Sequence, residues 1–259
     1  MNKYLLVFKL SLYQAFEYRF DFFMGTFKYA SYIILMSLIW LGVNQFGNIE
    51  QTTNQTVTYF IFAALLYSFS NFHPYYIEED IRLGFLNQYL LKPISPTYYY
   101  LAKQSAWTIL ETLMKIFVII PIIYLFGFRF TTDLPHLLLF LLYPPLIFFF
   151  AFNLLTGISN LVFWLSEAFA LRWATTIVQR FLSGMLVPIS YFSPFFQKIS
   201  FYLPFEHLGY VPIQVLTNQF ELPQIYASLT ILASWSMVMF AIRQTVWRIG
   251  LYQYEGTGI

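Results

Sequence analysis

Long apolar segments separated by short polar loops dominate the pattern of hydrophobic and polar positions along this chain. A helix needs about 20 apolar residues to cross the hydrocarbon core of a bilayer. Six segments meet that length, and they are 22–46, 57–77, 104–126, 136–164, 173–192 and 222–246. The pattern therefore predicts an all-α integral membrane protein with six transmembrane helices, in which residues 1–259 form a single transmembrane domain.

Composition excludes the other broad classes of protein. Charged residues are 10% of the chain and hydrophobic residues 59%, whereas a soluble domain carries about 25% charged residues. Disordered chains are poor in the apolar and aromatic residues that are abundant here. The absence of cysteine excludes a disulfide framework and cysteine-ligated metal sites. No basic cluster indicates a nucleic-acid partner, so membrane lipids are the expected surroundings.

The distribution of Lys and Arg predicts the orientation, because cytoplasmic loops retain positive charge. With a cytoplasmic N-terminus, nine basic residues fall on the inner side and two, Arg129 and Lys198, on the outer side. The inner residues are Lys3, Lys9, Arg19, Arg82, Lys92, Lys103, Arg172, Arg243 and Arg248. We therefore expect both termini in the cytoplasm. The first apolar run starts too late for a cleavable signal peptide.

Residues 1–21 precede the first span and show helical amphipathicity. At 100° per residue, one face collects apolar side chains and the opposite face polar ones. The apolar face holds Leu5, Phe8, Leu12, Ala15 and Phe16, and the polar face holds Lys3, Gln14, Glu17 and Asp21. This pattern predicts a helix lying in the cytoplasmic interface. The alternative is that these residues simply begin the first span.

The loop 78–103 between the second and third spans has a regular order of acidic, apolar and proline residues. Its acidic start, Glu78-Glu79-Asp80, suits a helix N-terminus because of the helix dipole. Apolar residues follow at helical spacing and Pro93 then ends the helix; they are Ile81, Phe85 and Leu86. We expect a short amphipathic helix that offers a docking surface to a cytoplasmic partner. An ordinary structured loop is the alternative.

Prolines interrupt two further apolar segments. Pro144 and Pro145 lie inside the fourth span and should kink it, because they remove backbone donors. Residues 193–221 are apolar but broken by prolines, and such interrupted segments are typical of re-entrant structure. We expect a short helical hairpin that dips back from the outer face.

The ionisable residues inside predicted spans include Glu111, Lys115 and Arg180, which are candidates for a functional role. An unpaired charge in the membrane costs roughly 2.5–3.5 kcal/mol, so pairing is expected. We predict that Glu111 pairs with Lys115 on its own helix or with Arg180 across helices. The pair either fixes helix packing or lines a transport pathway, in which case Arg180 meets an anionic head group.

Three motifs in order give the chain a family resemblance. It resembles the ABC-2 permeases, the type-2 membrane subunits of ABC transporters. The first motif is Glu79-Asp80-Ile81-Arg82-Leu83-Gly84-Phe85-Leu86 followed by Leu90-Leu91-Lys92-Pro93-Ile94-Ser95-Pro96. The second comprises Gly157, Phe163 and Trp164; the third is Ser183-Gly184 with Pro188, then Leu203-Pro204-Phe205 and Pro212. The resemblance covers the whole chain.

The resemblance implies a complete transport assembly. Such permeases pair as homodimers or heterodimers on two ATP-binding subunits in the bacterial plasma (inner) membrane, and export lipids, glycans, peptides or drugs. It implies that the N-terminal helix is an elbow helix and that the loop 78–103 is a coupling helix. The implied coupling residues are Glu79, Asp80, Arg82, Gly84, Phe85, Leu86, Lys92 and Pro93. The implied outer-hairpin residues are Pro188, Pro204, Phe205 and Pro212.

Motif searches limit the chemistry of the chain itself. It has no G-x-x-x-x-G-K-[ST] run, so no cofactor is expected in this chain, and MgATP belongs to a partner subunit. It also lacks H-E-x-x-H and G-x-S-x-G, so a catalytic or metal site is not expected. A secondary active transporter remains the alternative, although such proteins usually show longer chains with inverted repeats. Co-purification of an ATPase would separate the two.

Overall fold

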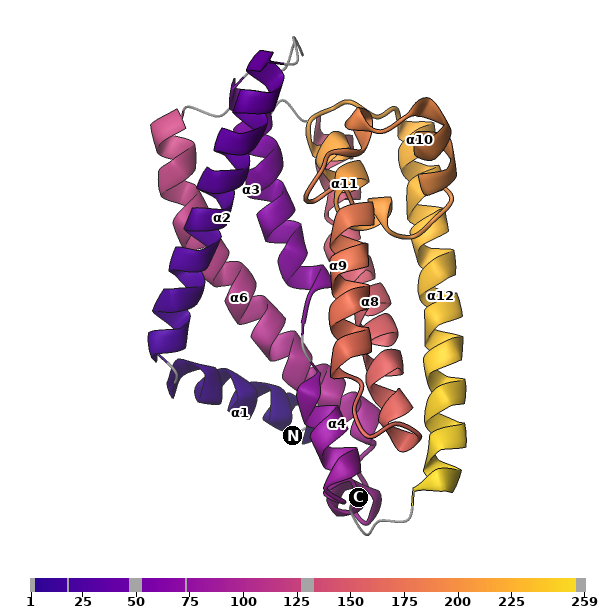
Figure 1. Ribbon diagram of the computed structural model, residues 1–259. Coiled ribbons are helices and arrows are strands. Elements are labelled where there is room, and N and C mark those ends of the chain that lie inside the picture. The colour runs from indigo at the N-terminus through magenta and orange to yellow at the C-terminus, as the bar shows by residue number, and fades with distance from the viewer. Residues whose placement is uncertain (1–2, 18, 47–52, 73, 127–132, 255–259) are drawn as a thin grey trace.

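The computed structural model describes residues 3–17, 19–46, 53–72, 74–126 and 133–254. Within these residues every regular element is a helix, and the long helices run side by side along one direction (Figure 1). The all-α prediction is therefore confirmed. Arg129, one of the two predicted outer charges, lies outside the described residues.

The helices follow one another in the order that the hydrophobic pattern predicts. The longer ones are α2 (Arg19–Phe46), α3 (Thr53–Ser70), α6 (Pro96–Phe126), α8 (Tyr143–Ser159), α9 (Phe169–Leu182) and α12 (Leu222–Gln253). The shorter ones are α1 (Lys3–Glu17), α4 (Tyr75–Arg82), α5 (Asn87–Leu90), α7 (Leu134–Phe140), η1 (Asn160–Phe163), η2 (Ile189–Tyr191), α10 (Pro194–Ser200), η3 (Glu206–Leu208) and α11 (Tyr210–Leu216).

Three helical stretches among the described residues are long and apolar enough to cross a membrane, judged by length and composition. They are Pro96–Ile122, Leu134–Phe163 and Leu222–Gln253, which coincide with the predicted third, fourth and sixth spans. In α2 the apolar stretch is the shorter Phe27–Val43. The three stretches place at least this part of the chain in the class of multi-pass membrane proteins.

The predicted fifth span, 173–192, is wrong as one continuous helix. α9 has 14 residues, about 21 Å at 1.5 Å per residue, which is shorter than a hydrocarbon core of about 30 Å. It ends at Leu182, and Gly184 follows with φ of +79°, a left-handed conformation that glycine adopts without strain. Hydropathy cannot detect this end, because the residues beyond it remain apolar.

Other boundaries also differ from the prediction, and among them α12 runs to Gln253 where the predicted sixth span ends at 246. α3 ends at Ser70, and Tyr75–Ile77, assigned to the second span, belong to α4. α6 begins at Pro96, eight residues before the predicted 104, since proline is favoured in the first turn of a helix.

The kink predicted from Pro144 and Pro145 is confirmed. The helical path breaks at Leu141–Leu142, between α7 and α8, and both prolines occupy the first turn of α8. The backbone N–H groups in the first turn of a helix have no acceptor within the helix. Proline has no N–H, so its presence there removes no helical hydrogen bond.

α8 is the centre of the packing. It lies along α12 and against α3, and its buried side chains join those of α11 and α12 in the largest apolar core. At the far end of α12, Gly250 lies against the ring of Phe163, where a Cβ would come within 2.1 Å of the ring. The absence of a side chain at Gly250 therefore allows α12 and η1 to pack closely.

α1 is a separate helix that lies across the end of the other helices and packs along α6 (Figure 1). It is therefore not the beginning of α2, the alternative left open above. Within α1, Ser11 is buried, whereas Leu5, Leu6 and Leu10 are exposed. Of the predicted apolar face, Leu5 is exposed and Leu12 packs against Leu110 and Met114 of α6, and the interfacial location stays a prediction.

The two ends of the molecule differ in what they contain. α1, α4 and the C-terminal end of α12 lie at one end, and α10 and α11 lie at the opposite end (Figure 1). Residues 193–221 form two short helices joined through η3, with α11 buried in the main core. Whether this hairpin is re-entrant in a membrane stays a prediction.

Candidate functional site

The loop between α3 and α6 forms two short helices, so the single helix predicted up to Pro93 is wrong. α4 ends at Arg82, and Gly84 follows with φ of +76°. α5 then begins at Asn87. The positive φ of Gly84 turns the chain, and this conformation is costly for any residue with a Cβ.

The predicted docking surface of this loop is partly buried. Ile81 and Leu86 lie in the core, whereas Phe85 is 56% exposed. Three further leucines are exposed beside Phe85, and these are Leu83, Leu90 and Leu91. The predicted charged members Glu79, Arg82 and Lys92 are exposed as well, and so is Pro93. The outer surface of the loop is therefore a mixture of apolar and charged groups.

Asp80 fixes α4 onto α6. The Tyr100 hydroxyl donates a hydrogen bond of 2.8 Å to its carboxylate, and the Tyr76 and Tyr89 rings pack against Tyr100. Burial raises the pKa of the Asp80 carboxyl above its ordinary value, and the hydrogen bond from Tyr100 opposes this shift. Asp80 is thus an anchor beneath the exposed surface of the loop.

An ion pair joins α4 to α9. The Glu78 carboxylate in the first turn of α4 pairs with the Arg172 guanidinium in the first turn of α9. The Ser159 hydroxyl at the end of α8 donates a hydrogen bond of 2.9 Å to the same carboxylate. Arg172 is 3% exposed and Glu78 13%. From the sequence, Arg172 was predicted only as an inner-side charge, and its partner was not predicted.

α9 buries polar residues and exposes apolar ones. Its buried row recurs at helical spacing and consists of Arg172, Thr176 and Gln179. The Gln179 amide donates a hydrogen bond of 2.8 Å to the carbonyl oxygen of Ser70, the last residue of α3. The opposite face exposes Phe169, Trp173, Ile177 and Phe181. This arrangement is the reverse of a helix on a soluble domain, and it suits an apolar environment outside α9.

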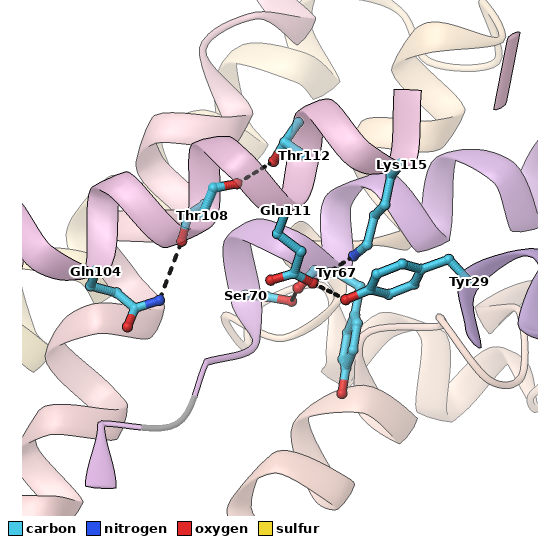
Figure 2. A network of polar contacts seen from close by, with 8 residues as sticks. All are labelled: Tyr29, Tyr67, Ser70, Gln104, Thr108, Glu111, Thr112 and Lys115. Atoms are coloured by element: carbon cyan, nitrogen blue, oxygen red, sulfur yellow. Dashed lines mark hydrogen bonds and ion pairs between the residues drawn. The ribbon is translucent and has the colours of Figure 1, made fainter. Parts of the chain in front are cut away.

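The charged residues predicted inside the spans form a cluster: Figure 2 shows Glu111 and Lys115, and Arg180 shares the ring of Tyr67 with Lys115. Lys115 Nζ lies 3.0 Å from Glu111 Oε1, which confirms the predicted pairing on one helix. The Tyr29 hydroxyl of α2 donates a hydrogen bond to the same Glu111 oxygen. The alternative pairing across helices does not form, since no carboxylate of the described residues lies within 4.0 Å of Arg180.

Three tyrosine rings surround the two cations. Lys115 Nζ lies 3.8 Å from the ring centroid of Tyr29. The Arg180 guanidinium lies 4.8 Å from the centroids of both Tyr32 and Tyr67. Such cation–π contacts are attractive because the ring faces are electronegative. These tyrosines were not predicted as site residues, because nothing in the sequence distinguishes them from the many other aromatic residues of the chain.

The predicted hairpin residues contribute mainly to packing. Pro188, Pro204 and Pro212 are buried and Phe205 is half-buried. Next to them, the Ser200 hydroxyl donates a hydrogen bond to the Glu206 carboxyl. His207 contacts Ser228 Oγ of α12 at 2.8 Å through Nδ1 and the Phe201 carbonyl oxygen at 2.8 Å through Nε2. These contacts fix η3 between α10 and α12.

Arg243 is a second buried cation that sequence analysis assigned to the inner side. Its Nε donates a hydrogen bond of 2.7 Å to Asn153 of α8, and a terminal nitrogen donates one of 3.3 Å to Thr97 of α6. It therefore joins α12, α8 and α6.

Comparison with known proteins identifies the family. A family model described as ABC-2 family transporter protein matches residues 27–258, which is nearly the whole chain. The chain belongs to the ABC-2 transporter family. It is a multi-pass membrane permease of an ABC transporter, a transport component that generally works with an ATP-binding subunit. No curated protein and no solved structure matches the chain significantly.

The predicted site residues of this ABC-2 permease fall into three groups along its helices. The loop of α4 and α5 lies at one end and the hairpin of α10 and α11 at the other (Figure 1). Glu111 lies 15 residues after the start of α6 at Pro96, about 22 Å along the helix. The charge cluster thus lies between the two ends, at a depth where ionisable residues are functional candidates.

Proposed function

We propose that this permease is the membrane subunit of an ATP-driven exporter of an amphiphilic, lipid, glycan, peptide or drug substrate. Two permeases, identical or homologous, assemble on two ATP-binding subunits in a bacterial plasma membrane. α2, α3, α6, α7–α8 and α12 form five of the six crossings, α9 together with the non-helical residues after Leu182 forms the other, and both termini are cytoplasmic. The common location of α1 and the C-terminal end of α12 supports an even number of crossings.

The main support for coupling to an ATPase is the surface of the α4–α5 loop. Leu83, Phe85 and Leu91 are exposed in a segment that also exposes charged residues. Contiguous exposed apolar side chains with a charged rim mark protein interaction sites. Beneath them, Ile81, Leu86 and the Asp80–Tyr100 hydrogen bond hold the loop to the core. The proposed partner is the ATP-binding subunit, which binds and hydrolyses MgATP.

The ion pair of Glu78 and Arg172 gives a route from this surface to the transport pathway. A displacement of α4 by the ATP-binding subunit would act directly on the first turn of α9 through this pair. The Gln179–Ser70 hydrogen bond adds a second contact between α9 and the segment that leads into α4. Transport then requires that each nucleotide state favours a different position of α9.

The experiment compares two exposed phenylalanines at opposite ends of the molecule. Phe85 is 56% exposed in the coupling loop, and Phe195 is 74% exposed on α10. Tagged protein is isolated from native membranes in mild detergent, and the co-purifying subunits are quantified by mass spectrometry. We expect an ATP-binding-cassette subunit with the wild type and with Phe195→Glu, and its loss with Phe85→Glu.

Two results would contradict the proposal. A chain that purifies alone, or only with itself, while other membrane complexes stay intact would favour a secondary transporter. Equal retention of the ATPase by Phe85→Glu and Phe195→Glu would remove the α4–α5 loop from the interface. A second, different permease in the purified complex would identify a heterodimer.

A further inference from the structure

The charge cluster between α2, α3, α6 and α9 has more cations than anions. Lys115 and Arg180 are cationic, and Glu111 is the carboxylate that contacts this cluster among the described residues. Lys115 is 1% exposed. Its Nζ is paired with Glu111, whereas the Nε of Arg180 is a buried atom without a hydrogen-bond partner among the described residues. One positive charge therefore remains unbalanced at membrane depth.

Neighbouring groups reduce this imbalance without removing it. The tyrosine rings attract the cations but carry no net charge. The carbonyl end of α3 supplies partial negative charge. However, its Tyr67 carbonyl accepts the Asn71 N–H at 3.0 Å, and its Ser70 carbonyl accepts the Gln179 amide at 2.8 Å. Glu111 already accepts from Tyr29 and pairs with Lys115. Buried charges are normally paired, so an anion from outside the chain would complete the cluster.

The cluster reaches the surface of the permease between apolar faces. Glu111 is 27% exposed and Arg180 is half-buried, so the cluster is not sealed. On α2 the neighbouring exposed side chains include the apolar Phe27 and Ile34 and a further cation, Lys28. On α9 they include Ile177 and Phe181. An anion that arrives here has apolar surface on both sides, which suits a ligand with an apolar tail.

We propose that this cluster binds the anionic head group of an amphiphile whose tail lies along the exposed faces of α2 and α9. Arg180 and Lys115 hold the head group, which presents a phosphate, carboxylate or sulfonate. Glu111 competes with it for Lys115 and retains that lysine when no ligand is bound. This inference rests on the proposed transport of amphiphiles and specifies the charge of the molecule that is bound.

The test measures head-group preference in the intact complex. Protein isolated from native membranes is incubated with an equimolar mixture of phosphatidylglycerol and phosphatidylcholine of matched acyl chains. Native mass spectrometry then gives the ratio of the two bound lipids. We expect a preference of about tenfold for phosphatidylglycerol, since a charge-assisted hydrogen bond is worth roughly that factor.

Two variants should change the preference in opposite directions. Arg180→Gln removes a cation and should lower the preference by about tenfold, whereas Glu111→Gln removes the competing carboxylate and should raise it. Arg248→Gln is the control, because it removes an exposed cation of α12 outside the cluster and should change nothing. Where Arg180→Gln does not fold, Arg180→Lys keeps the charge and should keep the preference, and Glu111→Gln decides the question.

The remaining outcomes overturn the proposal. The wild type, Arg180→Gln and Glu111→Gln could bind the two lipids in the same ratio, or Glu111→Gln could lower the preference for phosphatidylglycerol. Either result would show that the cluster only fixes helix packing. Abolition of the preference by millimolar inorganic phosphate would make the site one for a free anion and not for an amphiphile. The ATP-binding subunit should co-purify with both variants whatever their lipid preference. A failure of the head-group proposal therefore differs from a failure of the proposed function, in which the subunit is absent.

Discussion

The ion pair between α4 and α9 makes a quantitative prediction about stability. Glu78→Met leaves Arg172, which is 3% exposed, without a carboxylate partner. Removal of one partner from a buried ion pair costs about 3–5 kcal/mol, because the remaining charge stays buried without compensation. Arg172→Met leaves Glu78 instead, which is 13% exposed and still accepts the Ser159 hydrogen bond. We therefore expect a smaller loss, about 2 kcal/mol.

The double variant separates the pair from its parts. Glu78→Met with Arg172→Met replaces both charges by apolar side chains, and such replacements of buried pairs are often nearly neutral. We expect the double variant within about 1 kcal/mol of the wild type, which gives an interaction energy of at least about 4 kcal/mol in a double-mutant cycle. Glu79→Met is the matched control, since Glu79 is the next residue and is exposed. Its effect should stay within about 0.5 kcal/mol.

The assay is thermal unfolding of the purified complex, followed by size-exclusion chromatography of a fluorescent fusion. For a chain of this length about 1 kcal/mol corresponds to roughly 2–4 °C in Tm. Glu78→Met should lower Tm by roughly 6–20 °C, and the double variant by less than about 4 °C. If the two single effects simply add in the double variant, or if Glu79→Met equals Glu78→Met, the pair does not couple α4 to α9. The proposed route to the pathway then fails.

Three further predictions concern packing and protonation. Gly250→Ala should lower the free energy of unfolding by about 1–3 kcal/mol, since its Cβ would lie 2.1 Å from the Phe163 ring. The control is Gly42→Ala, which has no atom within 4 Å of the added Cβ and should be neutral or stabilising. Equal Tm values for the two variants would contradict this prediction. Burial raises the pKa of Glu206 in the outer hairpin from 4.5 to about 7, against the Ser200 hydrogen bond. The stability that the protonated carboxyl contributes is therefore complete below the unfolded pKa and is lost as pH rises through about 7; it amounts to about 3 kcal/mol at most. Glu206→Gln should therefore flatten the decline of Tm between pH 5 and 8. An unchanged slope in this variant would exclude Glu206 as the cause of the decline. Arg243→Met should lower Tm by more than Arg248→Met, because Arg243 is buried and bonded to Asn153 whereas Arg248 is exposed.

The sequence predicted those features that depend on local pattern. Continuous apolar runs indicated the helices, and the all-α class and the break near Pro144 are confirmed. The pairing of Glu111 with Lys115 was predictable because residues four apart lie on one helix face. In each case the decisive residues are neighbours along the chain.

Features that depend on distant residues were not predictable from the sequence. Arg172 belonged to the inner-side charges, because its partner Glu78 lies on another helix and nothing in the local pattern relates the two. The end of α9 was missed because it depends on the φ angle of Gly184 and not on hydropathy. The single coupling helix was wrong for the same reason at Gly84. A positive-φ glycine ends a helix without changing the apolar pattern around it.

The polar attachment of α9 is suited to a helix that moves. An apolar interface in a membrane gains little from the hydrophobic effect, because lipid is as apolar as the protein surface. Directional contacts therefore determine where α9 lies, and those described here are the Glu78–Arg172 pair and the Gln179–Ser70 hydrogen bond. A helix held by a few such contacts can exchange one set for another, while the largest apolar core of α8, α11 and α12 keeps its packing. Because Arg180 lies on the same helix, a change at Arg172 would also shift the cation that we assign to the head group.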